Sequence, residues 1–380
     1  STNSDGVRAS HPHEHGINAL LHSPILTRST KAIGRLAHAT PHMPHIPDLP
    51  HMHLLPNRGP SVEASLSALN LEDASITSIL EHMRKHPDNV KVQERGCARL
   101  TSLAKQRDNM QEITDAGGIE IILNAARNHN DDTELLSQSF SALGNISALN
   151  SENKQEIGLQ GIETIVSSMR AHAYDPVLQE RACGLLFNLS FDHQNKELIA
   201  DAGGIEAIIG AMKNHSAHPN LQHNAVAALW NLGGEVANKE RIASANGVHT
   251  IIRSMDTHRE HTHIQRSALG ALRTLSMHHG AKEHIAKHGG VASTLNAMRH
   301  HSTDRHVQKE GCGLMRNLLT HHSHRETLRS HRPERELEHA ADKFPVDCED
   351  NAYSCLERLE QVSERNSSSR TQSKHTADEL

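Results

Sequence analysis

The sequence predicts an all-α solenoid, a fold in which short helical units stack on one another and share a single core. Two observations carry this prediction. A motif recurs every 43 residues through most of the chain, and only 36% of the 380 residues are hydrophobic, with 2% aromatic. Units this poor in large apolar side chains cannot seal their own apolar faces, so they must bury them against neighbouring units.

The register of the repeat is set by glycine. Five glycines are each separated by 43 residues, namely Gly118, Gly161, Gly204, Gly247 and Gly290. An apolar residue follows each of them, and Ile76 occupies the same position one period earlier. Leucine-rich columns further along share the spacing, so we count six units in phase.

Each unit is predicted to contain three helices. Residues 195–233 show three short helical patterns, separated by a Gly-Gly break and by a polar loop rich in His, Asn and Pro. The glycine pairs recur with the repeat, which indicates a structural role for them. Four cysteines share one core column, Cys97, Cys183, Cys312 and Cys355, and are predicted to be buried.

The two ends of the chain depart from the repeat. Residues 1–65 form a His/Pro-rich arm without helical or strand periodicity, and residues 363–380 form a polar tail; we expect both to be disordered. The solenoid is predicted to span residues 66–362, with about six repeats and a degenerate seventh unit that caps the stack.

Composition excludes several classes of function. The net charge of −6 disfavours nucleic acid as a partner, and the chain shows neither a membrane span nor a secretory signal. No catalytic or cofactor-binding motif is present, so we expect a non-enzymatic protein without cofactors. These features together predict a soluble protein of the cytoplasm or the nucleus.

The repeat resembles the armadillo family. The phrases DAGGIEAII, ALWNLG, LLFNLS and LGNIS look like its consensus, and the similarity covers about residues 70–361. The resemblance implies a right-handed superhelix whose third helices line a concave groove for extended peptides. It therefore implies a protein-binding scaffold or adaptor, which we expect to be a monomer.

The same resemblance points to a ladder of asparagines on the third helices that contacts the main chain of a bound peptide. This position holds Asn145, Asn188, Asn231 and Asn317, whereas Ser102 and Thr274 interrupt it. An amide offers both a donor and an acceptor to a peptide backbone. The alternative is that these amides link adjacent third helices internally.

Other third-helix residues complete the predicted peptide-binding groove. Phe187 and Trp230 are aromatic candidates for an anchor, although packing into the core is an equal alternative. The basic candidates are Arg181, Arg266, Arg273, Lys309 and Arg316. They concentrate toward the C-terminal units, which favours extended partner segments of acidic or phosphorylated character; an ordinary solvated face is the alternative.

Two rival functions remain open. An import adaptor of the importin-alpha type would pair each asparagine with a tryptophan four residues earlier, but this chain has Ser141, Gly184, Ala227 and Gly313 there. The 34 histidines permit a metal-binding buffer or sensor, although no closed ligand set is apparent and no metal ligand is assigned. Six histidines share one position at the end of the second helix, His86, His129, His172, His215, His258 and His301. We expect these six to hydrogen-bond carbonyls at helix ends.

Overall fold

The computed structural model describes the backbone of residues 74–321 and 324–377, and the side chains as far as residue 361. Residues 71–380 form one compact unit. The arm predicted over residues 1–65 lies outside the described residues, as does the start of the solenoid at residue 66.

The described residues are helical and contain no strand, which confirms the all-α class. The helices of the first three units are α2 (Ile76–Lys85), α3 (Val90–Leu103), α4 (Arg107–Asp115), α5 (Gly118–Asn128), α6 (Thr133–Ser147), α7 (Ser151–Ala171) and α8 (Pro176–Leu189). Those of the fourth and fifth are α9 (His193–Asp201), α10 (Gly204–Asn214), α11 (Pro219–Leu232), α12 (Val236–Ser244), α13 (Gly247–Thr257) and α14 (Thr262–Leu275). The sixth and seventh contain α15 (His279–Lys287), α16 (Gly290–His300), α17 (Arg305–Leu319), α18 (Arg325–Ser330), α19 (Glu334–Lys343) and α20 (Pro345–Ala377).

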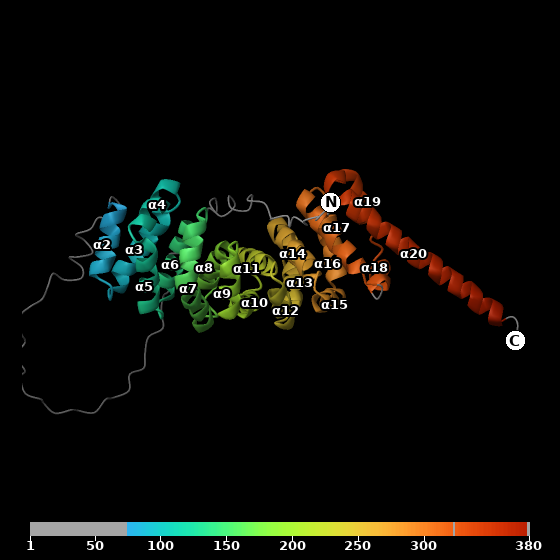
Figure 1. Ribbon diagram of the computed structural model, residues 1–380, viewed down its shortest axis with the longest axis horizontal. Helices are drawn as coiled ribbons and strands as arrows, with labels where there is room; N and C mark the ends of the chain where they lie inside the picture. Colours follow the sequence, from blue (N-terminus) through green and yellow to red (C-terminus); the bar gives the residue numbers. More distant parts are fainter. Residues whose placement is uncertain (1–73, 322–323, 378–380) are drawn as a thin grey trace, which may run out of the picture. The chain divides into compact units, whose positions relative to one another are not determined.

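The helices stack unit upon unit in sequence order, as the colour gradient of Figure 1 shows. Each third helix packs against the third helix of the next unit, in the order α3, α6, α8, α11, α14, α17 and α20. One hydrophobic cluster runs without interruption from Ile76 on α2 to Leu359 on α20. The predicted solenoid with a shared core is therefore confirmed.

The break between first and second helices depends on a left-handed backbone conformation. Gly117, Gly203 and Gly289 have φ values of 73°, 76° and 80°, and Asn246 has 63° at the same position of the fifth unit. These residue types adopt that conformation at low cost.

The third unit differs from the prediction of three helices. Gln160 stands at its break position, and α7 runs straight through from Ser151 to Ala171 as a single helix. Glutamine is a good helix former without a preference for the left-handed region, so the first and second helices remain joined. This unit consists of two helices.

The repeated histidines join successive units. In five units the imidazole Nε2 donates a hydrogen bond of 2.7–3.0 Å to a carbonyl oxygen in the preceding unit's loop, and the pairs are His129–Pro87, His172–Asn130, His215–Ala173, His258–Ser216 and His301–Arg259. Each histidine is also the C-cap residue of its second helix. The predicted carbonyl contact is confirmed, but it is made across the unit boundary and not within the helix that the histidine ends.

A column of buried glutamines fixes the turn between second and third helices. Each glutamine Nε2 donates to two carbonyl oxygens at the end of the second helix, at 2.8–3.2 Å, in the case of Gln93, Gln179, Gln222, Gln265 and Gln308. One of these carbonyls always belongs to the repeated histidine. Buried carbonyl groups that would otherwise lack partners are thereby satisfied.

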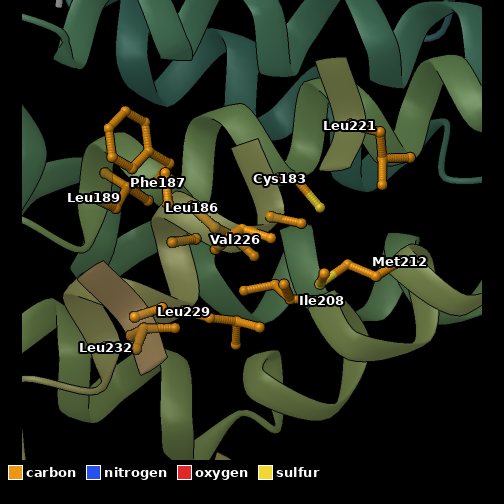
Figure 2. Packing of buried hydrophobic residues seen from close by; sticks show 14 of the residues in the cluster. Cys183, Leu186, Phe187, Leu189, Ile208, Met212, Leu221, Val226, Leu229 and Leu232 are labelled. Carbon is orange, nitrogen blue, oxygen red and sulfur yellow. The ribbon is translucent and has the colours of Figure 1, made fainter. Parts of the chain in front are cut away.

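The core between units is built from small and medium aliphatic side chains. Figure 2 shows Cys183 and Leu186 of α8 packed close to Ile208 of α10 and Val226 of α11. All five cysteines are buried, as predicted for the core column. Burial raises the pKa of the Cys97 and Cys183 thiols to about 12, so both stay protonated at neutral pH.

The C-terminal tail differs from the prediction. Helix α20 continues to Ala377, through most of the segment 363–380 that was predicted to be disordered. This stretch is polar, but it contains neither proline nor glycine, and a helix that starts against the stack therefore meets no breaker.

At two glycines of the fourth unit, substitution by alanine should change the free energy of unfolding in opposite directions. Gly203→Ala should lower the free energy of unfolding by about 1 kcal/mol or more, since an alanine at φ 76° is strained. Its Cβ would also lie 2.0 Å from Nη2 of Arg170 and displace the hydrogen bond of that atom to the Ala202 carbonyl. Urea unfolding would measure the effect.

The matched control is Gly210→Ala, within α10. A Cβ at Gly210 meets no atom within 4 Å, so alanine should raise the free energy of unfolding by about 0.5–1 kcal/mol through helix propensity. Equal effects of the two substitutions would contradict the role assigned to the left-handed break.

Candidate functional site

The candidate site is the third-helix surface, which we define as the exposed side of α3, α6, α8, α11, α14 and α17. Side-chain N-caps start several of these helices and set their register: Asn89, Asp132, Asp175 and Asp304 each accept a hydrogen bond from a backbone N–H in the first turn. Because consecutive third helices are in contact, equivalent positions form rows across the units.

The predicted asparagine ladder links the helices of this surface; Asn188 is buried, at 7% exposed, whereas Asn145, Asn231 and Asn317 are partly exposed. Asn145 Nδ2 donates to the Thr101 carbonyl at 2.9 Å, and Asn188 Nδ2 donates to the Gly144 carbonyl at 2.9 Å. Asn231 Nδ2 reaches Ser190 Oγ at 3.1 Å. Asn317 Nδ2 reaches Ser276 Oγ at 2.9 Å. The internal alternative thus accounts for the amide nitrogen of every ladder member.

The amide oxygens of the ladder differ from the amide nitrogens in their hydrogen bonding. Within the part of the chain that the structure describes, the Oδ1 atoms of the four ladder asparagines accept no hydrogen bond. An amide oxygen has two lone pairs, so each can still receive an N–H donor. The ladder consequently offers acceptors to a ligand, whereas the sequence predicted both acceptors and donors.

The two aromatic candidates are packed into the stack. Phe187 is 8% exposed and contacts Phe191, with ring centroids 5.2 Å apart; Figure 2 labels Phe187 among the buried residues. Trp230 is partly buried and lies against Gly270 of the next unit, where an added Cβ would approach its ring to 2.5 Å. Neither is a freely exposed anchor. The exposed aromatic of this region is Phe191, which is 40% exposed and which the sequence reasoning did not single out.

Two glycines in the column four residues before the ladder position are covered by side chains from the preceding unit, namely Gly270 before Thr274 and Gly313 before Asn317. Trp230 covers Gly270, and Arg273 covers Gly313, where an added Cβ would lie 2.5 Å from Arg273 Nε. A tryptophan of the importin-alpha type has no room at these two positions.

Most of the predicted basic residues are paired with the unit that follows. Arg266 forms a two-pronged ion pair with Asp304, and Arg273 Nη1 lies 3.1 Å from Glu310 Oε2. Lys309 Nζ lies 3.3 Å from Asp347 Oδ1, and Arg316 Nη1 donates to Asn351 Oδ1 at 2.9 Å. The charges of Arg266, Arg273 and Lys309 are therefore partly neutralised within the stack, whereas Arg316 has a neutral amide as its partner.

The carboxylates of these pairs titrate accordingly. Burial raises the pKa of Asp304, but the hydrogen bonds and charge of Arg266 outweigh it and hold the pKa below its usual range. The same balance, with Arg305 and Lys309 as the cations, lowers the pKa of Asp347. The basic edge predicted over the fifth and sixth units is thus accompanied by an acidic column that the sequence reasoning did not consider.

Arg181 is the predicted cation with the loosest pairing. Its side chain is 50% exposed, and Nη1 lies 3.8 Å from Oε1 of its neighbour Glu180. It shares one face of α8 with the exposed Val177 and the buried Asn188, at helical spacing, and Phe191 lies two residues beyond the end of this helix. An acceptor, a cation and apolar surface therefore meet on the third unit.

His223 on α11 occupies the repeat position that Glu180 holds on α8 and Arg266 holds on α14. The Nδ1 atom of His223 on α11 is buried and has no hydrogen-bond partner in the described residues, and its ring centroid lies 5.7 Å from that of His263. Burial, and secondarily the charge of His263, lower the pKa of His223 to about 4.

Other kinds of site are less well represented. Among residues 74–321 and 324–361, no group of three or more His, Cys, Asp or Glu side chains is arranged to hold a metal ion. The histidines of the N-terminal arm, residues 1–65, lie outside the described residues. A search of the described helices finds none of the length and apolarity that a membrane span requires.

Solved structures similar to this one define the class of protein. An engineered protein matches with a TM-score of 0.66 at 21% identity, over 78% of this chain and 71% of its own. A structure described as concerning the interaction between cadherin and beta-catenin matches with a TM-score of 0.68 at 15% identity, over 79% of this chain and 55% of its own. A designed armadillo repeat protein in complex with the peptide (KR)4 matches with a TM-score of 0.54 at 15% identity, over 64% of this chain and all of its own. The fold is thus that of armadillo repeat proteins.

The family follows from the sequence comparison. Residues 61–291 match the family model described as LRRK2 ARM repeat, and the chain belongs to this family. A comparison with curated proteins gives no match. The armadillo resemblance inferred from the repeat is confirmed.

Replacing Asn188 should weaken the contact between α6 and α8. Asn188→Ala removes the hydrogen bond to the Gly144 carbonyl and should lower the free energy of unfolding by about 1 kcal/mol. Asn220→Ala, an exposed asparagine of α11, serves as the control and should change it little. No difference between the two variants in urea unfolding would mean that the ladder does not hold the helices together.

His223 should make folding sensitive to acid. Its folded-state pKa of about 4 lies below the ordinary value of 6.5, so the unfolded state binds more protons at low pH. Stability linked to this residue should be intact above pH ~6.5 and decrease as the pH falls toward 4. His223→Gln should therefore lose less stability than the parent protein between pH 7 and 5 in thermal melts.

The control for this titration is His306→Gln, at an exposed position on α17. It should follow the parent protein's pH profile. If His223→Gln and the parent protein lose stability in parallel, the buried imidazole is not responsible for acid sensitivity.

Proposed function

We propose that the chain is a non-enzymatic adaptor that holds an extended segment of a partner protein on the third-helix surface of the second to fourth units. The observation that carries the proposal is the row of amide oxygens on Asn145, Asn188 and Asn231, which accept no hydrogen bond in the described residues. The armadillo fold is typical of peptide-binding scaffolds, and a designed armadillo repeat protein among the similar structures is in complex with a peptide.

The spacing of the row suits an extended chain. Helices that pack side by side lie roughly 8–10 Å apart, and an extended peptide rises roughly 3.3 Å per residue. One amide oxygen would therefore meet about every third residue of the ligand. Because the amide nitrogens are engaged within the stack, the proposed contacts run from ligand N–H groups to protein oxygens.

Side-chain selectivity would come mainly from the third unit. Arg181 is half exposed and only loosely paired, so it can receive an acidic or phosphorylated ligand residue. Val177 at the start of α8 and Phe191, two residues after its end, are 52% and 40% exposed, and would contact apolar ligand residues. Arg266, Arg273 and Lys309 of the fifth and sixth units would have to give up their carboxylate partners first.

We also propose that the protein acts in the cytoplasm or the nucleus. Five free cysteines, all buried, suit a reducing compartment, which supports the cytoplasm or the nucleus. A fluorescent fusion of the full chain would report this directly.

A peptide-display selection on the full chain would test the proposed function. Selected peptides should lose about tenfold or more in affinity for the Asn145→Ala, Asn188→Ala, Asn231→Ala triple variant, because three hydrogen bonds are removed. Arg181→Glu should selectively weaken peptides that carry acidic residues, and calorimetric titration would measure both effects.

The control is Leu159→Ser, at an exposed position of α7 away from the third helices. It should bind every selected peptide like the parent protein. Melting curves must show that the triple variant is folded at the assay temperature. Unchanged peptide affinity in a folded triple variant would place binding on another surface and overturn the proposal.

A further inference from the structure

A cavity lies between the second helices of the fourth and fifth units and is distinct from the third-helix surface. Helices α10 and α13 are in contact there, and the cavity has a volume of about 80 Å³. A cavity needs about 10–15 Å³ to hold one water molecule, so this one has room for several waters or for one tetrahedral oxyanion. Its lining includes Lys213, Ser216, His249, Thr250, Arg253 and Ser254.

The lining carries positive charge that is not paired. The side chains of Lys213 and Arg253 are exposed, and within the described residues neither makes a hydrogen bond or an ion pair. Burial and the charge of His288 lower the pKa of His249. The charges of Arg253 and Lys213 lower that pKa further, so the charges that act on this imidazole are all positive.

A buried hydroxyl group also lines the cavity without a partner. Ser254 is 4% exposed, and among residues 74–321 and 324–361 its Oγ makes no hydrogen bond. The hydroxyl groups of Thr250 and Thr257 instead donate to main-chain carbonyl oxygens of their own helix or its cap, at 2.9 and 2.8 Å. Buried polar atoms without partners are rare, so Ser254 Oγ is a donor left for a group that enters the cavity.

The walls of the cavity are fixed by contacts that recur along the stack. Gln222 Nε2 donates to the carbonyl oxygens of Met212 and His215. His258 Nε2 donates to the carbonyl oxygen of Ser216. Three carbonyl oxygens at the end of α10 and in the following loop are therefore paired, and they repel an anion less than unpaired ones would.

The neighbouring unit boundaries lack this combination of residues. Between α13 and α16 the positions equivalent to Lys213, His249, Arg253 and Ser254 hold Asp256, Ala292, Asn296 and Ala297. The cavity there measures about 10 Å³, which leaves room for one water at most. Between α7 and α10, Glu206 stands at the His249 position, and Arg170 at the Lys213 position donates to the Ala202 carbonyl at 2.7 Å. Stacking therefore does not require the unpaired cations, and their presence at one boundary indicates a local role.

We propose that this cavity is a binding site for one phosphoryl group, either inorganic phosphate or the phosphate monoester of a phosphorylated side chain. The planar guanidinium of Arg253 can bond two phosphate oxygens at once, and Lys213 adds a point charge. His249 and Ser254 supply a ring N–H and a hydroxyl donor. Met212 is the large apolar side chain of the lining, so recognition rests on the oxyanion and not on an attached apolar group.

Calorimetric titration of the full chain with inorganic phosphate and with a capped phosphoserine would test the site. Ionic strength is held constant, because salt screens exposed charges. Arg253→Asn and Ser254→Ala introduce the residues that the next unit carries at the same positions, so the fold accommodates them. We expect Arg253→Asn to lower the affinity about tenfold and Ser254→Ala about threefold. Similar affinity for both probes assigns the site to the phosphoryl group alone, whereas stronger binding of capped phosphoserine assigns it to a phosphorylated protein segment.

The control for charge is Arg107→Gln, at an exposed position of α4 in the second unit. It should bind both probes like the parent protein. Equal losses in Arg253→Asn and Arg107→Gln would indicate an adventitious ion only, and no binding at millimolar phosphate would equally refute the site.

The imidazole resonances give a second, local readout. The resonance that is missing from His249→Ala should shift when phosphate is added to the parent protein, whereas that of the exposed His306 on α17 should not. A His249 resonance that stays in place while phosphate binds would put the anion elsewhere and refute the site. The Asn145→Ala, Asn188→Ala, Asn231→Ala triple variant should retain phosphate binding, so this test is independent of the proposed peptide surface.

Discussion

The structure depends on one constraint: no unit is complete without its neighbour. A unit of two or three short helices has an apolar face that it cannot cover and loop carbonyls that it cannot satisfy. The next unit supplies both, since its helices extend the common core and its histidine Nε2 donates to the open loop carbonyl, as His172 does to Asn130. The geometry of the unit boundary therefore recurs along the stack, because the residues that form it recur every 43 residues.

The contacts between units engage polar groups that would otherwise be available to a ligand on the third-helix surface. The asparagine nitrogens bond the preceding third helix, and Arg266 and Arg273 pair with acids of the following unit. In the proposed function, recognition depends on groups that the stack does not use, namely the amide oxygens, Arg181 and the exposed Val177 and Phe191. Stability and the proposed binding would then depend on the same side chains, and a substitution on the ladder would change both.

The stack could be predicted from the sequence because the residues that stabilise it recur with the repeat. Glycine at the start of the second helices, cysteine in the core column and histidine at the helix ends recur for local reasons that a single chain reveals, and these assignments are confirmed, except that Gly161 of the third unit lies within α7. The single helix α7 was missed, since the departure is one residue, Gln160, at a position whose importance is clear only once the φ angles of the other breaks are known.

The candidate site could be predicted only in part. The position of the asparagine ladder follows from the repeat, but the direction in which each amide points depends on the carbonyl or hydroxyl group beside it in the preceding unit. The basic columns were visible in the sequence; their partners lie 35–38 residues onward, at another position of the next unit, and pair with them only when the helices are packed. Such pairs join residues at different repeat positions in adjacent units, so a comparison of equivalent positions does not detect them.

The terminal unit shows what happens where the repeat stops. Helices α6, α8, α11, α14 and α17 each pack on a third helix on both sides. Helix α20 packs on one third helix, α17, where Arg305 and Lys309 hold Asp347 and three thiols lie buried in the core, and it also packs on α19 and α18 of its own unit. Opening at this end of the stack breaks the contacts of one unit boundary, whereas opening in the middle breaks those of two, so the terminal unit should open more readily than the inner ones.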